Sequence, residues 1–159
     1  MRGRGVLLAL VAAAAIVLGA GGPALAGYAS IVVDADTGRV LHAANADTRN
    51  YPASLTKMMT LYMTFEALKA GDLHLNQRLP VSKRAEGQAP SKLYLKQGET
   101  ISVDAAIMAL VTKSANDVAT VVAEALGGTE IGFAQMMTRK ARELGMARTT
   151  FRNASGLPN

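Results

Sequence analysis

One helix constrains the fold of this chain more than any other segment. Pro52 suits the first turn of a helix and Gly71 suits the position just past its end, so the sequence predicts a helix over residues 53–70. Its early turns have no charged face, because the side without large apolar residues carries only threonines, at positions 56, 60 and 64. A helix of this composition is expected to be surrounded by protein.

Residues 1–26 have the pattern of a secretory signal peptide. Two arginines precede an apolar run over residues 6–20, and Ala24 and Ala26 place small side chains where a signal peptidase recognises its substrate. As a helix the run would reach about 22 Å, which is short of the roughly 30 Å hydrocarbon core of a bilayer. We therefore expect an exported chain that is cleaved after Ala26 rather than one held in the membrane by this segment.

Charge and cysteine content narrow the function classes. Removing residues 1–26 lowers the formal net charge from +5 to +3, which is too mild to indicate nucleic-acid binding. The chain has no cysteine, so an exported form must fold by packing alone. Export without disulfides favours a bacterial periplasm or cell envelope.

The mature part, residues 27–159, begins with strand chemistry. Apolar runs over residues 30–33 and 39–42 flank a turn-forming segment, and this order predicts an antiparallel hairpin. Two strands alone are marginally stable, so the hairpin needs partners elsewhere in the chain.

The next connecting segment, residues 72–97, is predicted to be irregular because it contains Pro80, Gly87 and Pro90. We interpret it as a solvated surface loop. The less favoured alternative is contact with an anionic wall polymer, through the basic residues Lys83, Arg84, Lys92 and Lys96.

The second half of the chain predicts a helical lobe. Ser102 can cap a helix that ends near Thr112, and a second helix should begin near Asp117 and stop at the glycine pair 127–128. Thr129 can cap a third helix, which Gly145 closes. The final residues, 149–159, have strand and turn chemistry.

Ser54 and Lys57 are the strongest candidates for chemistry. Residues three apart on a helix share one face, so the hydroxyl and the amine can meet. An ordinary lysine has a pKa of about 10.4, and holding it neutral at pH 7 requires about 4 to 5 kcal/mol. Burial and the positive end of the helix dipole both favour the neutral amine, and no carboxylate lies within one helical turn of Lys57. The pair therefore predicts a serine nucleophile with a lysine base, and the backbone N–H of Ser54 can serve as one oxyanion donor.

Neither short motif is specific when taken singly. An S-x-x-K tetrad arises by chance in on the order of half of chains this long. The tripeptide from Ser114 to Asn116 is as common, and by itself it suggests only an interhelix turn.

Together, and in this order, the two motifs resemble those of penicillin-binding proteins and serine β-lactamases, whose sites combine S-x-x-K, S-x-N and a later K-T-G. The similarity is greater for the serine D-alanyl-D-alanine carboxypeptidases, the low-molecular-mass penicillin-binding proteins of peptidase family S11. It covers essentially all of residues 28–159, and it is carried by the runs 45–60, 113–117 and 144–158.

The resemblance implies an α+β, β-lactamase/transpeptidase-like fold, in which helices flank an antiparallel sheet beside an all-α lobe. It implies that Ser54 forms an acyl-enzyme with the penultimate D-Ala of the peptidoglycan pentapeptide, and that Lys57 accepts its proton. Ser114 would relay protons to the leaving amine, and Asn116 would bind the substrate backbone. It also implies that β-lactam antibiotics acylate Ser54 and that no cofactor or metal is required.

The K-T-G motif is absent, because no lysine of the chain is followed by Thr-Gly. In the family that later strand supplies a second oxyanion donor and a cation for the substrate carboxylate. We therefore expect the N-terminal part of a longer carboxypeptidase, truncated before the later sheet strands. Any membrane association would then depend on a missing C-terminal segment.

Several alternatives compete with this interpretation. The triplet at residues 36–38 spells the aspartic-protease signature, but it falls in the predicted hairpin turn. His42 and His74 are isolated, which argues against a metal site. A β-lactamase would need a deacylating glutamate in a suitable loop, and the candidates Glu124, Glu130 and Glu143 do not fit one. A non-catalytic wall-binding or penicillin-sensing fragment stays open, because the third motif is missing.

Overall fold

A computed structural model describes residues 28–158, and these divide into two compact units at the boundary between Asn50 and Tyr51. The predicted signal peptide, with its cleavage point after Ala26, lies outside the described residues. In the first unit, strands β1 (Ser30–Val33) and β2 (Val40–Ala44) form the predicted antiparallel hairpin. The aspartic-protease-like triplet lies in its turn, where Asp34 accepts hydrogen bonds from the backbone and hydroxyl of Thr37. This contact lowers the pKa of Asp34.

The predicted helix over residues 53–70 is confirmed, although its first turn is tighter than an α-helix. A 3₁₀ turn, η1 (Ala53–Leu55), leads directly into helix α2 (Thr56–Ala70). Gly71 ends α2 in the left-handed conformation with φ of 84°, which glycine adopts without a steric penalty.

The expectation that protein surrounds this helix was wrong for one of its sides. The threonine side is the buried one, and Thr60 and Thr64 are almost fully covered. Met58, in contrast, is 68% exposed, and Leu55 and Phe65 are also exposed. Thr64 satisfies its buried hydroxyl by donating to the carbonyl of Thr60 one turn earlier, which makes a threonine face compatible with burial.

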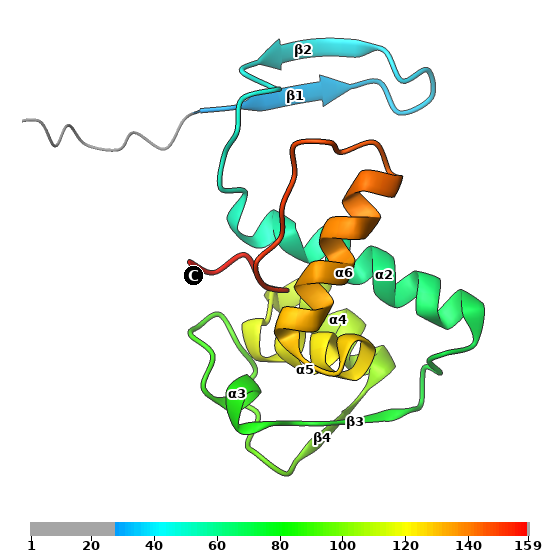
Figure 1. Cartoon of the computed structure of the whole chain (residues 1–159), viewed down its shortest axis with the longest axis vertical. Coiled ribbons are helices and arrows are strands. Elements are labelled where there is room, and N and C mark those ends of the chain that lie inside the picture. Colours follow the sequence, from blue (N-terminus) through cyan, green and yellow to red (C-terminus); the bar gives the residue numbers. More distant parts are fainter. Residues whose placement is uncertain (1–27, 159) are drawn as a thin grey trace, which may run out of the picture. The chain divides into compact units, whose positions relative to one another are not determined.

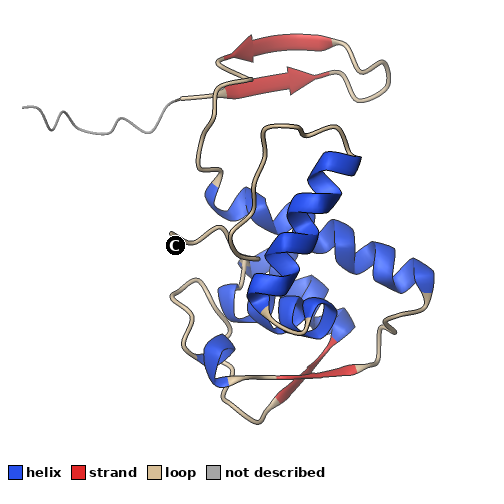
Figure 2. Ribbon diagram, in the orientation of Figure 1, coloured by secondary structure: helices blue, strands red, loops and turns tan. Residues whose placement is uncertain are grey.

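The predicted helical lobe is confirmed. Helices α4 (Val103–Lys113), α5 (Asn116–Gly127) and α6 (Glu130–Glu143) follow one another, and α5 contacts α2, α4 and α6 (Figures 1 and 2). The predicted caps hold as well. Ser102 accepts a hydrogen bond from the backbone of Ala105, and Thr129 accepts one from Gly132.

Residues 72–97 are more ordered than predicted. Strand β3 (Arg78–Pro80) pairs antiparallel with β4 (Thr100–Ser102), and a short helix, α3 (Lys83–Glu86), contacts α5. Figure 2 shows the two strands at the edge of the helical lobe. The segment buries Leu79 and Val81, so the interpretation as a purely solvated loop was wrong.

The last part of the chain folds back along α6 as a loop, drawn in red in Figure 1. Strand chemistry was predicted for residues 149–159, but residues 149–158 form bends and no strand. The hydroxyl of Thr138 on α6 accepts a hydrogen bond from the backbone of Phe151 at 2.9 Å. The following residues, 153–156, lie against the start of α2, where side chains of that helix donate hydrogen bonds to their carbonyl groups. Within residues 28–158, no helix is both long and apolar enough to cross a membrane.

Candidate active site

The structure brings Ser54 and Lys57 into direct contact. Ser54 lies in η1 and Lys57 in the first turn of α2, so the tight start of the helix places them on one side. The amine Nζ of Lys57 donates to the hydroxyl Oγ of Ser54 at 3.2 Å. The distance between a nucleophile and its base in known sites is similar.

Lys57 is buried while Ser54 is open to solvent. Only 3% of Lys57 is exposed, and this burial lowers the pKa of its amine. The direction matches the expectation from the sequence, and it raises the fraction of neutral amine able to accept a proton. A lysine base that is shielded from water, next to a serine hydroxyl that substrate can reach, suits nucleophilic catalysis.

A turn formed by residues 153–156, here called the C-terminal turn, closes over the start of α2. The amine of Lys57 donates a second hydrogen bond, of 2.9 Å, to the carbonyl oxygen of Ser155. One helical turn further on, the hydroxyl of Thr60 donates to the carbonyl of Ala154 at 2.8 Å. Two buried side chains of α2 therefore hold the turn by its backbone.

Asn153 and Gly156 give the C-terminal turn its shape. The side-chain oxygen of Asn153 accepts hydrogen bonds from the backbone N–H groups of Ser155 and Gly156, at 3.2 and 2.7 Å. Gly156 has φ of 82°, and a Cβ built there would overlap the carbonyl oxygen of Ala53. Only glycine fits where this turn meets the residue before Ser54.

The second predicted motif lies at the junction of α4 and α5. Ser114 ends α4 in the left-handed conformation with φ of 54°, and Asn116 begins α5. The side-chain amide of Asn116 donates to the carbonyl of Ala89 at 2.8 Å, and its backbone N–H donates to Ser91. Among the hydrogen bonds of residues 28–158, none joins Ser114 or Asn116 to Ser54 or Lys57.

Asp117, next to this motif, anchors the loop that follows α3. Its carboxylate is fully buried and accepts backbone hydrogen bonds from Leu93, Leu95 and Val118, at 3.0, 3.2 and 2.9 Å. Because two of these donors belong to the loop, Asp117 holds residues 93–95 against the start of α5.

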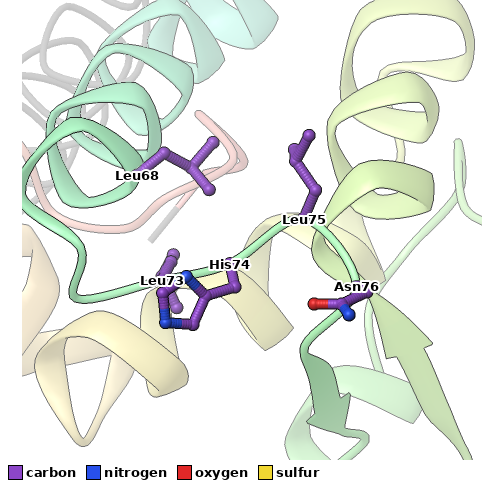
Figure 3. Close-up of a pocket in the computed structure, with 5 residues that line it drawn as sticks. All are labelled: Leu68, Leu73, His74, Leu75 and Asn76. Carbon is purple, nitrogen blue, oxygen red and sulfur yellow. The ribbon is translucent and has the colours of Figure 1, made fainter.

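The opposite end of α2 carries a different feature. Leu68, Leu73, His74, Leu75 and Asn76 line an open hollow, which Figure 3 shows in close-up. Leu68 follows Ser54 by about 20 Å of helix, so the hollow is separate from the serine–lysine pair. Across residues 28–158, no group of three His, Cys, Asp or Glu side chains has an arrangement that could hold a metal ion.

Sequence reasoning missed how the C-terminal turn contributes to this site. Asn153 and Gly156 were recognised within the family pattern, and Asn-x-x-Gly is turn chemistry. The contact between the carbonyl of Ser155 and Lys57 could not be predicted from local sequence, because 98 positions separate the two residues.

Comparison with known proteins gives the family. A family model described as D-alanyl-D-alanine carboxypeptidase, peptidase S11, matches residues 17–159. The D-alanyl-D-alanine carboxypeptidase DacF of Bacillus subtilis is 34% identical over 128 residues, which are 80% of this chain and 33% of that protein. The chain thus spans about a third of the length of the curated relatives it matches.

Solved structures agree with this assignment. The D-alanyl-D-alanine carboxypeptidase DacD from Francisella tularensis is 37% identical with a TM-score of 0.79, over 82% of this chain and 32% of that one. Penicillin-binding protein D2 from Listeria monocytogenes, in its ampicillin-bound form, is 33% identical with a TM-score of 0.73, over 87% of this chain and 55% of that one. The predicted α+β, β-lactamase/transpeptidase-like fold is confirmed. The chain belongs to the peptidase S11 family of D-alanyl-D-alanine carboxypeptidases.

Proposed function

We propose that this chain carries the acylating part of a serine D-alanyl-D-alanine carboxypeptidase. The observation that supports this most is the buried amine of Lys57, which lies 3.2 Å from the hydroxyl of the exposed Ser54. Family membership supports the same reaction class.

Ser54 is the proposed nucleophile and Lys57 its general base. The proton of the Ser54 hydroxyl passes to the neutral amine while the oxygen attacks the carbonyl carbon of the penultimate D-Ala. The C–N bond of the resulting tetrahedral intermediate then breaks, and the terminal D-Ala leaves as an amine after receiving a proton. Water later hydrolyses the acyl-enzyme. The backbone N–H of Ser54, in the first turn of the helix, is the proposed hydrogen-bond donor to the developing oxyanion.

Ser114 and Asn116, at the junction of α4 and α5, are the other two proposed site residues. Ser114 relays the proton from Lys57 toward the leaving amine, and Asn116 hydrogen-bonds the substrate backbone. The support is their order and spacing relative to Ser54 in the sequence, together with the contacts of α2 with α4 and α5. In the structure the side-chain N–H of Asn116 donates to the carbonyl of Ala89, and the amide has a second N–H and an oxygen with which it can hydrogen-bond the substrate.

The proposed substrate is the pentapeptide stem of peptidoglycan, and β-lactams are the proposed covalent inhibitors. A related penicillin-binding protein is known in an ampicillin-bound form, which supports the second part. The proposed location is the periplasm or cell envelope, reached by means of the signal peptide at residues 1–26.

Fluorescent penicillin tests the proposal directly. The chain should become labelled in a form that survives denaturing electrophoresis, and Ser54→Ala should abolish the label. Thr112→Ala removes an exposed hydroxyl on α4 and serves as a control that should label normally. Equal labelling of Ser54→Ala and the unaltered chain would contradict the assignment.

The β-lactamase alternative gains no support from the positions of the glutamates. Glu124 lies in α5 and accepts a hydrogen bond from Ser82, while Glu130 and Glu143 are the first and last residues of α6. None of these three occupies a loop from which it could deliver water to an acylated Ser54. The carboxypeptidase proposal is therefore the one that the site favours.

A further inference from the structure

We propose that Glu130 is a positioning residue for this site, because its buried carboxylate holds the C-terminal turn whose carbonyl oxygen contacts the amine of Lys57. The inference rests on the proposed function for its catalytic meaning. The effect of Glu130 on the surroundings of Lys57 can be measured without any enzymatic turnover.

Glu130 is buried to an extent that requires explanation. It is the first residue of α6, yet only 2% of it is exposed, and a buried carboxylate is unfavourable unless partners satisfy its charge. Both of its oxygens have such partners. One accepts from the guanidinium of Arg84 on α3, at 2.7 Å from Nε, and the other accepts from the backbone N–H of Ala154 at 3.3 Å.

These contacts connect α3 to the site through the C-terminal turn. The backbone N–H of Ala154 donates to Glu130, and the carbonyl oxygen of the same residue accepts a hydrogen bond from the hydroxyl of Thr60. The next residue, Ser155, gives its carbonyl to the amine of Lys57. Glu130 and Thr60 therefore fix the backbone of Ala154 by hydrogen bonds. Ala154 directly precedes Ser155, whose carbonyl oxygen accepts the hydrogen bond of Lys57.

The carbonyl oxygen of Ser155 helps to orient the amine of Lys57. Lys57 has two observed acceptors, the hydroxyl of Ser54 and the carbonyl of Ser155. A displaced turn would remove one acceptor and admit water to the amine, whose burial is the cause of its lowered pKa. Misplacement of a reacting group by about 1 Å can lower a rate about 10²-fold.

The first test measures Lys57 itself and needs no substrate. Competitive acetylation of the full chain at a series of pH values, read by mass spectrometry of each lysine peptide, gives the pKa of the Lys57 amine. In Glu130→Ala we expect this pKa to rise toward the ordinary value of about 10.4, because the loosened turn hydrates the amine. In Glu130→Gln the side-chain carbonyl still accepts from Ala154, so the pKa should stay closer to that of the unaltered chain.

The second test measures acylation by penicillin and separates the rate of acylation from the preceding non-covalent affinity. Glu130→Ala should lower the acylation rate roughly 10- to 100-fold at unchanged affinity, and Glu130→Gln should recover most of the loss. Glu143→Ala is the matched control. This glutamate lies on the same helix, pairs with Lys140 at the surface, and should change neither quantity.

Arg84→Met keeps the proposal testable if Glu130→Ala does not fold, as judged by circular dichroism. Arg84 is half exposed, and its loss leaves the carboxylate without its cationic partner. We expect a smaller rise in the pKa of Lys57 in the same direction. An unchanged Lys57 pKa in every folded Glu130 and Arg84 variant would overturn the proposal, as would a Glu130→Gln variant that behaves like Glu130→Ala. Absence of acylation in the unaltered chain would instead contradict the proposed function.

Discussion

The buried amine of Lys57 donates a 2.9 Å hydrogen bond to the carbonyl oxygen of Ser155, a residue 98 positions later in the chain. This bond joins α2, which directly follows the 3₁₀ turn of the proposed nucleophile, to the C-terminal turn, which follows α6 in the chain. The same amine lies 3.2 Å from the hydroxyl of Ser54. The proposed base is therefore oriented by a long-range contact as well as by its own helix.

The rate of acylation by penicillin should rise with pH as Lys57 loses its proton. Burial lowers the pKa of this amine from its ordinary value, so the rise should be centred below pH 10.5. Lys57→Arg should lower the rate by about 10²- to 10⁴-fold, because the guanidinium stays protonated throughout this range. Stopped-flow acylation from pH 6 to 10 measures both effects. A pH-independent rate in the unaltered chain would argue against Lys57 as the base.

Gly156→Ala should destabilise the chain by at least about 2 kcal/mol, because the left-handed backbone disfavours a side chain and the added Cβ meets the carbonyl of Ala53. Gly98→Ala is the matched control. Gly98 has φ of 88°, but nothing lies within 4 Å of its added Cβ, so only the backbone penalty of about 1 to 2 kcal/mol applies, and the loss should be smaller than for Gly156→Ala. Urea unfolding compares the two variants. Equal losses would mean that the contact with Ala53 does not restrict this position.

Asp117→Ala should destabilise the chain by about 2 to 4 kcal/mol, since it leaves backbone N–H groups of the 93–95 loop without their buried acceptor. Asp104→Ala removes an exposed carboxylate from the first turn of α4 and should change the free energy of unfolding by about 1 kcal/mol or less. The same unfolding measurement serves for both. A loss for Asp117→Ala no larger than that for Asp104→Ala would contradict the anchoring role.

Local signals made much of this fold predictable. Ser102 and Thr129 cap their helices as their residue types favour, and Gly71 ends α2 where its backbone freedom is needed. The contact of Ser54 with Lys57 was predictable for the same reason, because a spacing of three is decided by the helix itself.

Contacts between distant segments were not predictable from local patterns. The threonine face of α2 is buried because Thr60 and Thr64 satisfy their hydroxyls with carbonyl oxygens, one of them on Ala154. Local chemistry instead indicated a helix that protein covers on every side, because the threonine side of its early turns carries no charged residue. The segment after α6 has strand-forming residues, but the hydrogen bonds of Thr138 and Asn153 hold it as a loop.

The mass spectrum of the chain after reaction with ampicillin tests the central claim most directly. Opening the β-lactam ring expels no leaving group, so acylation should add the full mass of one ampicillin molecule. Peptide mapping should place this mass on the peptide that contains Ser54, and Ser54→Ala should show no addition. An adduct on a different residue, or one that persists in Ser54→Ala, would contradict the assignment of Ser54 as the nucleophile.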